Sequence, residues 1–86
     1  METQEQIINL NINTNAVKII KDKYKAQQII VNHLGIQAKE GTVFLINNQE
    51  IQIGSTGIYE ITDCAIESIY IKENNENIID CIFNIE

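Results

Sequence analysis

The stretch that most clearly predicts how this chain folds is Gly41-Thr42-Val43-Phe44-Leu45-Ile46-Asn47-Asn48-Gln49-Glu50-Ile51-Gln52-Ile53. It holds two short apolar segments, rich in β-branched and aromatic residues, on either side of Asn47-Asn48. Asparagine tolerates a positive φ, so this pair predicts the tight turn of a β-hairpin. Across the turn, two apolar side chains of the first segment should face two of the second: Phe44 and Ile46, then Ile51 and Ile53.

Further strands are predicted between this hairpin and the C-terminus. Turn residues separate short apolar runs here, as is typical of antiparallel β-structure. In chain order we expect a turn at Gly54-Ser55-Thr56-Gly57, a short strand at Ile58–Ile61 that stops near Asp63, a strand at Ala65–Ile71, a polar turn at Lys72–Asn77 and a closing strand at Ile78–Ile85.

The N-terminal part also predicts strands. Ile8, Leu10 and Ile12 alternate with asparagines, which gives one apolar and one polar face. A turn is expected at Asn13-Thr14-Asn15, and Val17-Lys18-Ile19 predicts a second strand. Residues 1–6 are polar and should form a mobile arm.

The segment after Asp22 allows two interpretations. A helix from Lys23 to Leu34 would have Asp22 as its cap and Gly35 as its stop. A strand over 29–37 fits the β-branched triplet that begins it, and is the preferred alternative. Altogether the sequence predicts a mainly β fold, a small antiparallel β-sandwich or barrel of about seven or eight strands, with residues 7–86 as a single domain.

Composition limits what the domain does. The net charge is −6 and there is no arginine, so general binding of nucleic acid is disfavoured. No apolar run approaches the length of a membrane helix, and no targeting signal is evident. A core this small has a thin stability margin, and assembly with other copies of the chain is the expected aid.

Residues that carry catalysis or bind metals are sparse. His33 is the single histidine, and Cys64 and Cys81 are the only cysteines. No spacing among them matches a zinc site, and neither Ser55 nor Ser68 lies in a nucleophile motif. We therefore predict a protein that is not an enzyme and has no cofactor or metal.

Three groups of residues are candidates for an interface or a ligand site. Tyr59 and Tyr70 are amphipathic side chains suited to interfaces, although packing on a sheet face with the hydroxyl in water is the preferred interpretation of each. The loop Gly54-Ser55-Thr56-Gly57 could bind an anion through backbone N–H groups, although a plain turn is the simpler interpretation. The third group is a lysine cluster that could contact an anionic partner or be a solvated surface: Lys18, Lys21, Lys23 and Lys25.

Part of the chain resembles a known module. The matching segments are Leu34–Ala38, Gly41–Asn47, Ile53–Ile61 and Ile78–Phe83. In this order they resemble a small β-module of virion-associated proteins from phages and prophages of AT-rich Gram-positive bacteria, with Gly57-Ile58-Tyr59-Glu60 as the most specific element. Cys81 stands where that module has an aromatic residue. The resemblance implies a structural or tail-associated role without catalytic residues.

Two functions are therefore expected. The first is a non-enzymatic virion component of the tail or head–tail region, made in the bacterial cytoplasm, which assembles with its own copies and other virion proteins through edge strands and an apolar or tyrosine patch. The alternative is a small phage-encoded anti-defence protein that inhibits a host factor or sequesters a nucleotide signal. That alternative would use the 54–57 loop and the lysine cluster.

Overall fold

A computed structural model describes residues 3–86 and confirms a mainly β fold. This part of the chain contains seven strands and one helix. They are β1 (Thr3–Ile8), α1 (Ala16–Tyr24), β2 (Ile29–Ala38), β3 (Val43–Ile46), β4 (Gln49–Gln52), β5 (Ile58–Ile66), β6 (Ile69–Ile71) and β7 (Asn77–Ile85).

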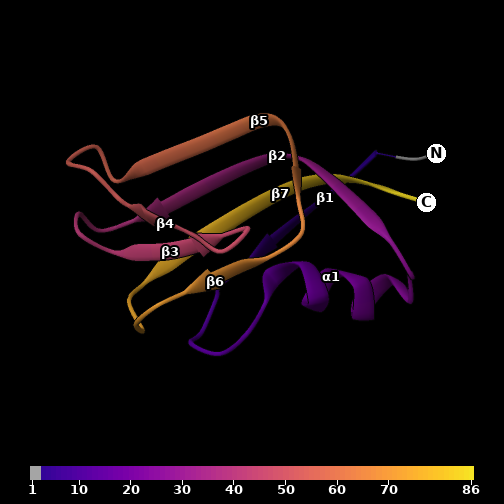
Figure 1. The fold of residues 1–86 in the computed structure, drawn as a ribbon, viewed down its shortest axis with the longest axis horizontal. Coiled ribbons are helices and arrows are strands. Elements are labelled where there is room, and N and C mark those ends of the chain that lie inside the picture. The colour runs from indigo at the N-terminus through magenta and orange to yellow at the C-terminus, as the bar shows by residue number, and fades with distance from the viewer. Residues whose placement is uncertain (1–2) are drawn as a thin grey trace.

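The strands form two antiparallel sheets packed as layers. One sheet has four strands in the order β1-β7-β2-β5, and the other has three in the order β4-β3-β6. Figure 1 shows the four-stranded sheet as the upper layer, with the three-stranded sheet and α1 beneath it. One face of the larger sheet is therefore covered, and its other face is open to solvent.

The core lies between these layers and consists mainly of isoleucine. Strand periodicity buries every second residue of β7, and Ile79, Cys81 and Phe83 are fully inaccessible. The ring of Tyr24 from α1 packs edge-on against Phe83, with 5.3 Å between the ring centroids. Burial raises the pKa of the Cys81 thiol to about 12, so this residue stays a neutral, small apolar side chain at physiological pH.

The predicted central hairpin is confirmed, with one change in register. Asn47 and Asn48 have φ values of 51° and 65°, as the two-residue turn requires. Phe44 pairs with Ile51, as expected. Ile46 pairs with Gln49, because a two-residue turn places its two flanking residues opposite each other.

The N-terminal prediction needs correction. Residues 3–6 are not a mobile arm, because they belong to β1 and pair with β7; residues 1 and 2 lie outside the described part. β1 ends at Ile8, so the alternating segment that follows it is not a strand. The turn expected near Asn13 is present, with a φ of 67° at that residue.

The position of the helix also differs from both alternatives. Residues 29–38 form β2, which confirms the preferred strand, whereas the helix occupies Ala16–Tyr24, where Val17–Ile19 had predicted a strand. The Asn15 side chain caps this helix by accepting a hydrogen bond of 3.0 Å from the Val17 N–H. Burial of one helix face outweighs the preference of β-branched residues for strands.

The C-terminal half differs in two boundaries. β5 continues past Asp63, which takes a φ of 57°, to Ile66, so the strand expected from Ala65 shortens to β6. The turn at 54–57 and the final strand agree with the prediction.

Among residues 3–86, no helix has the length and apolar character that crossing a membrane requires.

Asparagine side chains fasten the irregular segments to the sheets. The side-chain Oδ1 of Asn47 accepts from the Glu67 and Ser68 N–H groups, and its Nδ2 donates to the Ala65 carbonyl. The buried Asn77 amide does the same for Leu10: its Oδ1 accepts from the N–H and its Nδ2 donates to the carbonyl, each at 2.8 Å. The Asn77 side chain thus replaces a strand partner just beyond the end of β1.

Substitution Asn77→Ala should therefore be costly. It would leave the buried N–H and carbonyl of Leu10 without partners, and we expect the free energy of unfolding to fall by about 1–3 kcal/mol. Asn74→Ala is the matched control, because Asn74 accepts one bond, from the exposed Ile12 N–H, and should cost less than about 1 kcal/mol. Urea unfolding monitored by circular dichroism measures both, and equal losses in the two variants would contradict this role.

Candidate functional site

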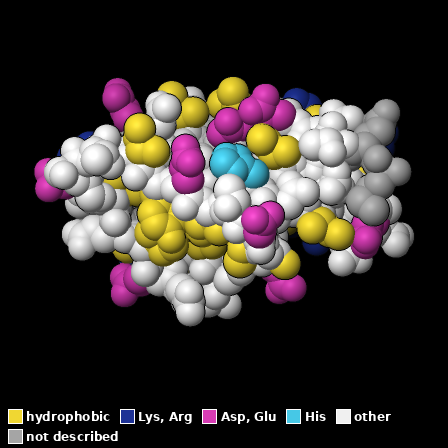
Figure 2. Space-filling view, turned by 90° about the horizontal axis from the view of Figure 1, so that it is seen from above, with side chains coloured by type: hydrophobic (Ala, Val, Ile, Leu, Met, Phe, Trp, Pro, Cys, Tyr) yellow, Lys and Arg dark blue, Asp and Glu magenta, His cyan; other side chains and the backbone are white. Residues whose placement is uncertain are grey.

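The open face of the four-stranded sheet gathers polar and apolar side chains from all four strands. Alternation along the strands places Glu5 and Ile7 of β1, Ile78, Asp80 and Ile82 of β7, His33, Gly35 and Gln37 of β2, and Ile58 and Glu60 of β5 on this face. Figure 2 shows this face, with the histidine near its centre among acidic and hydrophobic side chains. We refer to these ten residues as the open face.

A β-bulge directs His33 onto the open face. Val31 pairs with Phe83 and His33 with Ile82, so Asn32 is an extra residue between them. Without the bulge, Val31 and His33 would point to the same side, because residues two apart share a face. The bulge lets Val31 stay buried while the imidazole turns outward.

Gly35 leaves space beside the imidazole. A Cβ at this position would lie 4.0 Å from His33 Nε2 and 3.8 Å from the Asp80 Cβ, so the ring, Gly35 and the carboxylate are neighbours. Glu60 is the pairing partner of Gly35 on the other side. Gly35 therefore lies between Asp80 of β7 and Glu60 of β5, with the His33 ring beside it.

Glu5 and Asp80 form a close carboxyl pair across β1 and β7. The side-chain hydrogen bond and the charge of Asp80 raise the pKa of Glu5 above its ordinary value of 4.5, and His33 acts weakly in the opposite direction. Asp80 Oδ1 is inaccessible to solvent and accepts no hydrogen bond within residues 3–86. Protonation of Glu5 relieves the repulsion between the two carboxyls, which is why its pKa is raised.

The cluster has limited chemical capability. Two carboxyls and an imidazole can exchange protons, but within the described range no group of three histidine, cysteine, aspartate or glutamate side chains is arranged to hold a metal ion. The open face also carries exposed isoleucines, at 59% for Ile7, 53% for Ile58 and 44% for Ile78. A surface of this composition is better suited to contact another macromolecule than to enclose a small substrate.

The residues predicted from the sequence as a site lie elsewhere and apart. Tyr59 of β5 is half-buried and packs against the core, on the opposite side of its strand from Ile58. Tyr70 of β6 is half-buried and pairs with Leu45 in the three-stranded sheet. The two tyrosines do not share a face.

The predicted anion-binding groups are also separated. Lys18, Lys21 and Lys23 lie on α1 and Lys25 follows as its C-terminal cap, whereas Figure 1 shows the 54–57 loop, between β4 and β5, at the other end of the long axis. Lys18 forms an exposed ion pair of 3.1 Å with Asp22, and Lys23 donates to Gln6 Oε1 at 2.8 Å. A single chain therefore does not offer both groups to one ligand.

The open face was missed from the sequence, although it left a signal. Ile7-Ile8 and Ile78-Ile79 are pairs of adjacent isoleucines within strands. Successive residues of a strand point to opposite faces, so each pair predicts apolar side chains on both sides of the sheet.

Comparison of the chain with family models, with curated proteins and with solved structures finds no match.

The carboxyl pair should make stability depend on pH. Because the folded protein holds the Glu5 proton more tightly than the unfolded chain does, the stabilisation is present below pH 4.5 and is lost as pH rises through the raised pKa. Glu5→Gln removes the repulsion and keeps a donor for Asp80, so the melting temperature should exceed that of the wild type at about pH 7 but not at about pH 4.

The control for this prediction is Glu73→Gln, an exposed glutamate in the loop before β7. It removes the same formal charge without touching the pair, and its effect on melting should vary much less with pH. Thermal unfolding followed by circular dichroism across this pH range measures both variants. A Glu5→Gln profile that parallels the wild type would show that the two carboxyls do not share a proton.

Proposed function

We propose that this protein is a non-enzymatic assembly protein that joins other copies of itself through β1 and the neighbouring open face. The observation that carries the proposal is the exposure of Ile7 on an edge strand that, within residues 3–86, pairs only with β7. An edge strand offers unpaired N–H and carbonyl groups to a second chain. The two features together supply both direction and apolar area for association.

β1 is the edge with the least protection against such pairing. β4 and β6 have only four and three residues. β5 is interrupted by the left-handed conformation of Asp63, and it carries the charges of Glu60 and Asp63. Short length, bulges and charges are the features by which sheets block edge pairing. β1 has six residues, contains neither proline nor lysine, and bears one charge, on Glu5.

Ile7 provides apolar contact at the proposed interface. Complete burial of one such side chain contributes about 1.5–3 kcal/mol. Ile7 is 59% exposed, so covering it at the shared edge would supply a part of the about 8 kcal/mol that corresponds to a micromolar dissociation constant, and backbone hydrogen bonds between the two β1 strands would add to it. Two copies paired antiparallel through β1 would form one continuous eight-stranded sheet with a shared open face.

Self-association should weaken when the apolar side chains are removed. We expect Ile7→Ser to raise the dissociation constant at least about tenfold, because it removes apolar contact at the shared edge while leaving the charge unchanged. Ile19→Ser is the matched control, since Ile19 is exposed on α1, away from the open face. Light scattering coupled to size-exclusion chromatography gives the measurement. A wild type that stays monomeric at high concentration, or equal effects of the two variants, would refute assembly through this face.

A more specific role is proposed from the resemblance of Gly57-Ile58-Tyr59-Glu60 and its flanking segments to the phage module. On this proposal the assembled protein is a component of the virion, in the tail or head–tail region. In support, Ile58 and Glu60 of that element lie on the open face, where they would be available to a partner. The protein should then be found by mass spectrometry in purified particles, in several copies. Its absence from particles would remove the virion role but not the self-association.

A further inference from the structure

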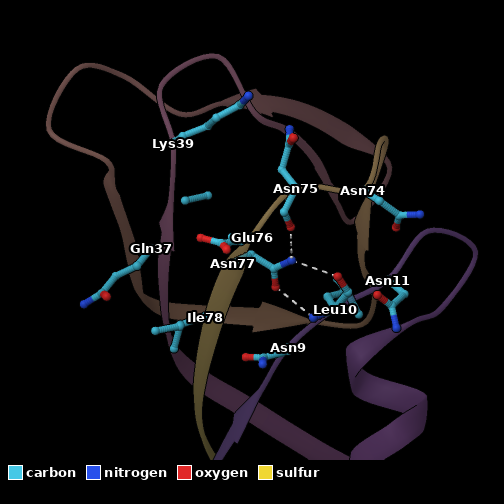
Figure 3. A pocket seen from close by; sticks show the side chains of 11 residues that line it. Asn9, Leu10, Asn11, Gln37, Lys39, Asn74, Asn75, Glu76, Asn77 and Ile78 are labelled. Carbon is cyan, nitrogen blue, oxygen red and sulfur yellow. Dashed lines mark hydrogen bonds between the residues drawn. The ribbon is translucent and has the colours of Figure 1, made fainter.

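An open groove lies at the end of the four-stranded sheet where β1 has ended. Its walls are the 9–11 segment, the last residues of β2 with Lys39, and residues 74–78 (Figure 3). The volume of the groove is about 1000 Å³, at the upper end of the range typical of ligand sites. The groove is open to solvent along its length, so a bound molecule would be partly exposed.

Side-chain amides hold the walls in place. Asn77 bridges the N–H and the carbonyl of Leu10, as described above, and Asn74 Oδ1 accepts from the Ile12 N–H at 2.8 Å. Asn75 donates to Thr42 Oγ1 at 3.3 Å. The segment after β1 is thereby fixed to the loop before β7, so the groove is preformed and a ligand need not order it.

A second set of amides in the groove is uncommitted. Asn9, Asn11 and Gln37 are exposed, and none of their side chains makes a hydrogen bond to another residue of the 3–86 range. Each side-chain amide presents both donors and an acceptor. Asn9 and Asn11 come from the segment after β1 and Gln37 from the end of β2, so amides line two sides of the groove, and the Gln37 side chain points away from Asn11 (Figure 3).

The remaining lining residues balance charge and add apolar surface. Lys39 and Glu76 contribute one charge of each sign, so the groove has no net formal charge. Ile78 is 44% exposed, so part of the lining is apolar. A polyanion such as a nucleotide finds one cation here and no arginine, which argues against that class of ligand.

From this composition we propose that the groove binds a neutral carbohydrate. Sugar hydroxyls act as donors and acceptors at once, and amides match them in both respects without a charge to desolvate. The C–H faces of the sugar rings would lie on the apolar surface that Ile78 provides. The groove shares Gln37 and Ile78 with the open face, but its amides all belong to one chain, so sugar binding does not require self-association.

The test is a titration of the isotope-labelled protein with neutral oligosaccharides, using maltotriose, cellotriose and chitotriose as probes and following backbone amides by NMR. We expect at least one probe to shift the signals of residues 9–11, 37–39 and 74–78 and to leave those of α1 unchanged. A short peptide of glycine and serine is the competing probe, because a peptide backbone also matches amides. Shifts from the peptide and from no sugar would overturn the carbohydrate assignment, as would the absence of shifts with all three sugars.

Variants then show whether the free amides do the binding. Gln37→Ala and Asn11→Ala remove uncommitted side chains and should each weaken the bound sugar about threefold to tenfold. Gln52→Ala is the matched control, an exposed amide on β4 outside the groove, and should bind as the wild type does. Unchanged affinity in both groove variants would refute the site. The spectrum of each unliganded variant shows whether it has retained its fold.

Discussion

The structure depends on the register of β7 between β1 and β2. Its inward residues, Ile79, Cys81 and Phe83, are fully buried, and the residues between them form the middle of the open face. Because side chains alternate along a strand, core and surface are set by the same choice of register. A slip by one residue would place Asp80 in the core, so the burial of Phe83 also fixes where the carboxylate lies.

This coupling explains why the open face combines groups that oppose each other. Glu5 and Asp80 repel each other when both are ionised, yet they lie where β1 must pair with β7. Their repulsion therefore weakens the pairing of the edge strand β1, which is also the strand that we propose joins a second copy. Acidification relieves the repulsion on the open face and lowers the charge near the proposed contact. Protonation of the pair would then favour association, and association would favour protonation.

Isoleucine and asparagine have separate tasks in this domain. Isoleucine fills the core and continues onto the outer sheet face, since adjacent isoleucines in a strand must point both ways. Asparagine adopts the positive φ of Asn13, Asn47 and Asn48 and binds backbone groups in the irregular segments. With no proline in the chain, these amides supply the constraints that keep the loops ordered. The same residue type also supplies exposed amides that line the groove.

The sequence by itself determined the strand content, the central hairpin and the final strand, because alternation and turn residues act between neighbours in the chain. It did not determine that residues 16–24 are helical. The type of residue at Asn15 fits a turn as well as a helix cap, and the helix is favoured because Ala16, Val17 and Ile20 are buried against the rest of the fold. The bulge at Asn32 and the pairing of β1 with β7 were equally hidden, because both depend on residues far apart in the sequence. Only the tertiary structure brought Glu5, His33 and Asp80 together, or made one groove from three distant segments. Local patterns define strands, whereas a surface site is defined by which strands lie side by side.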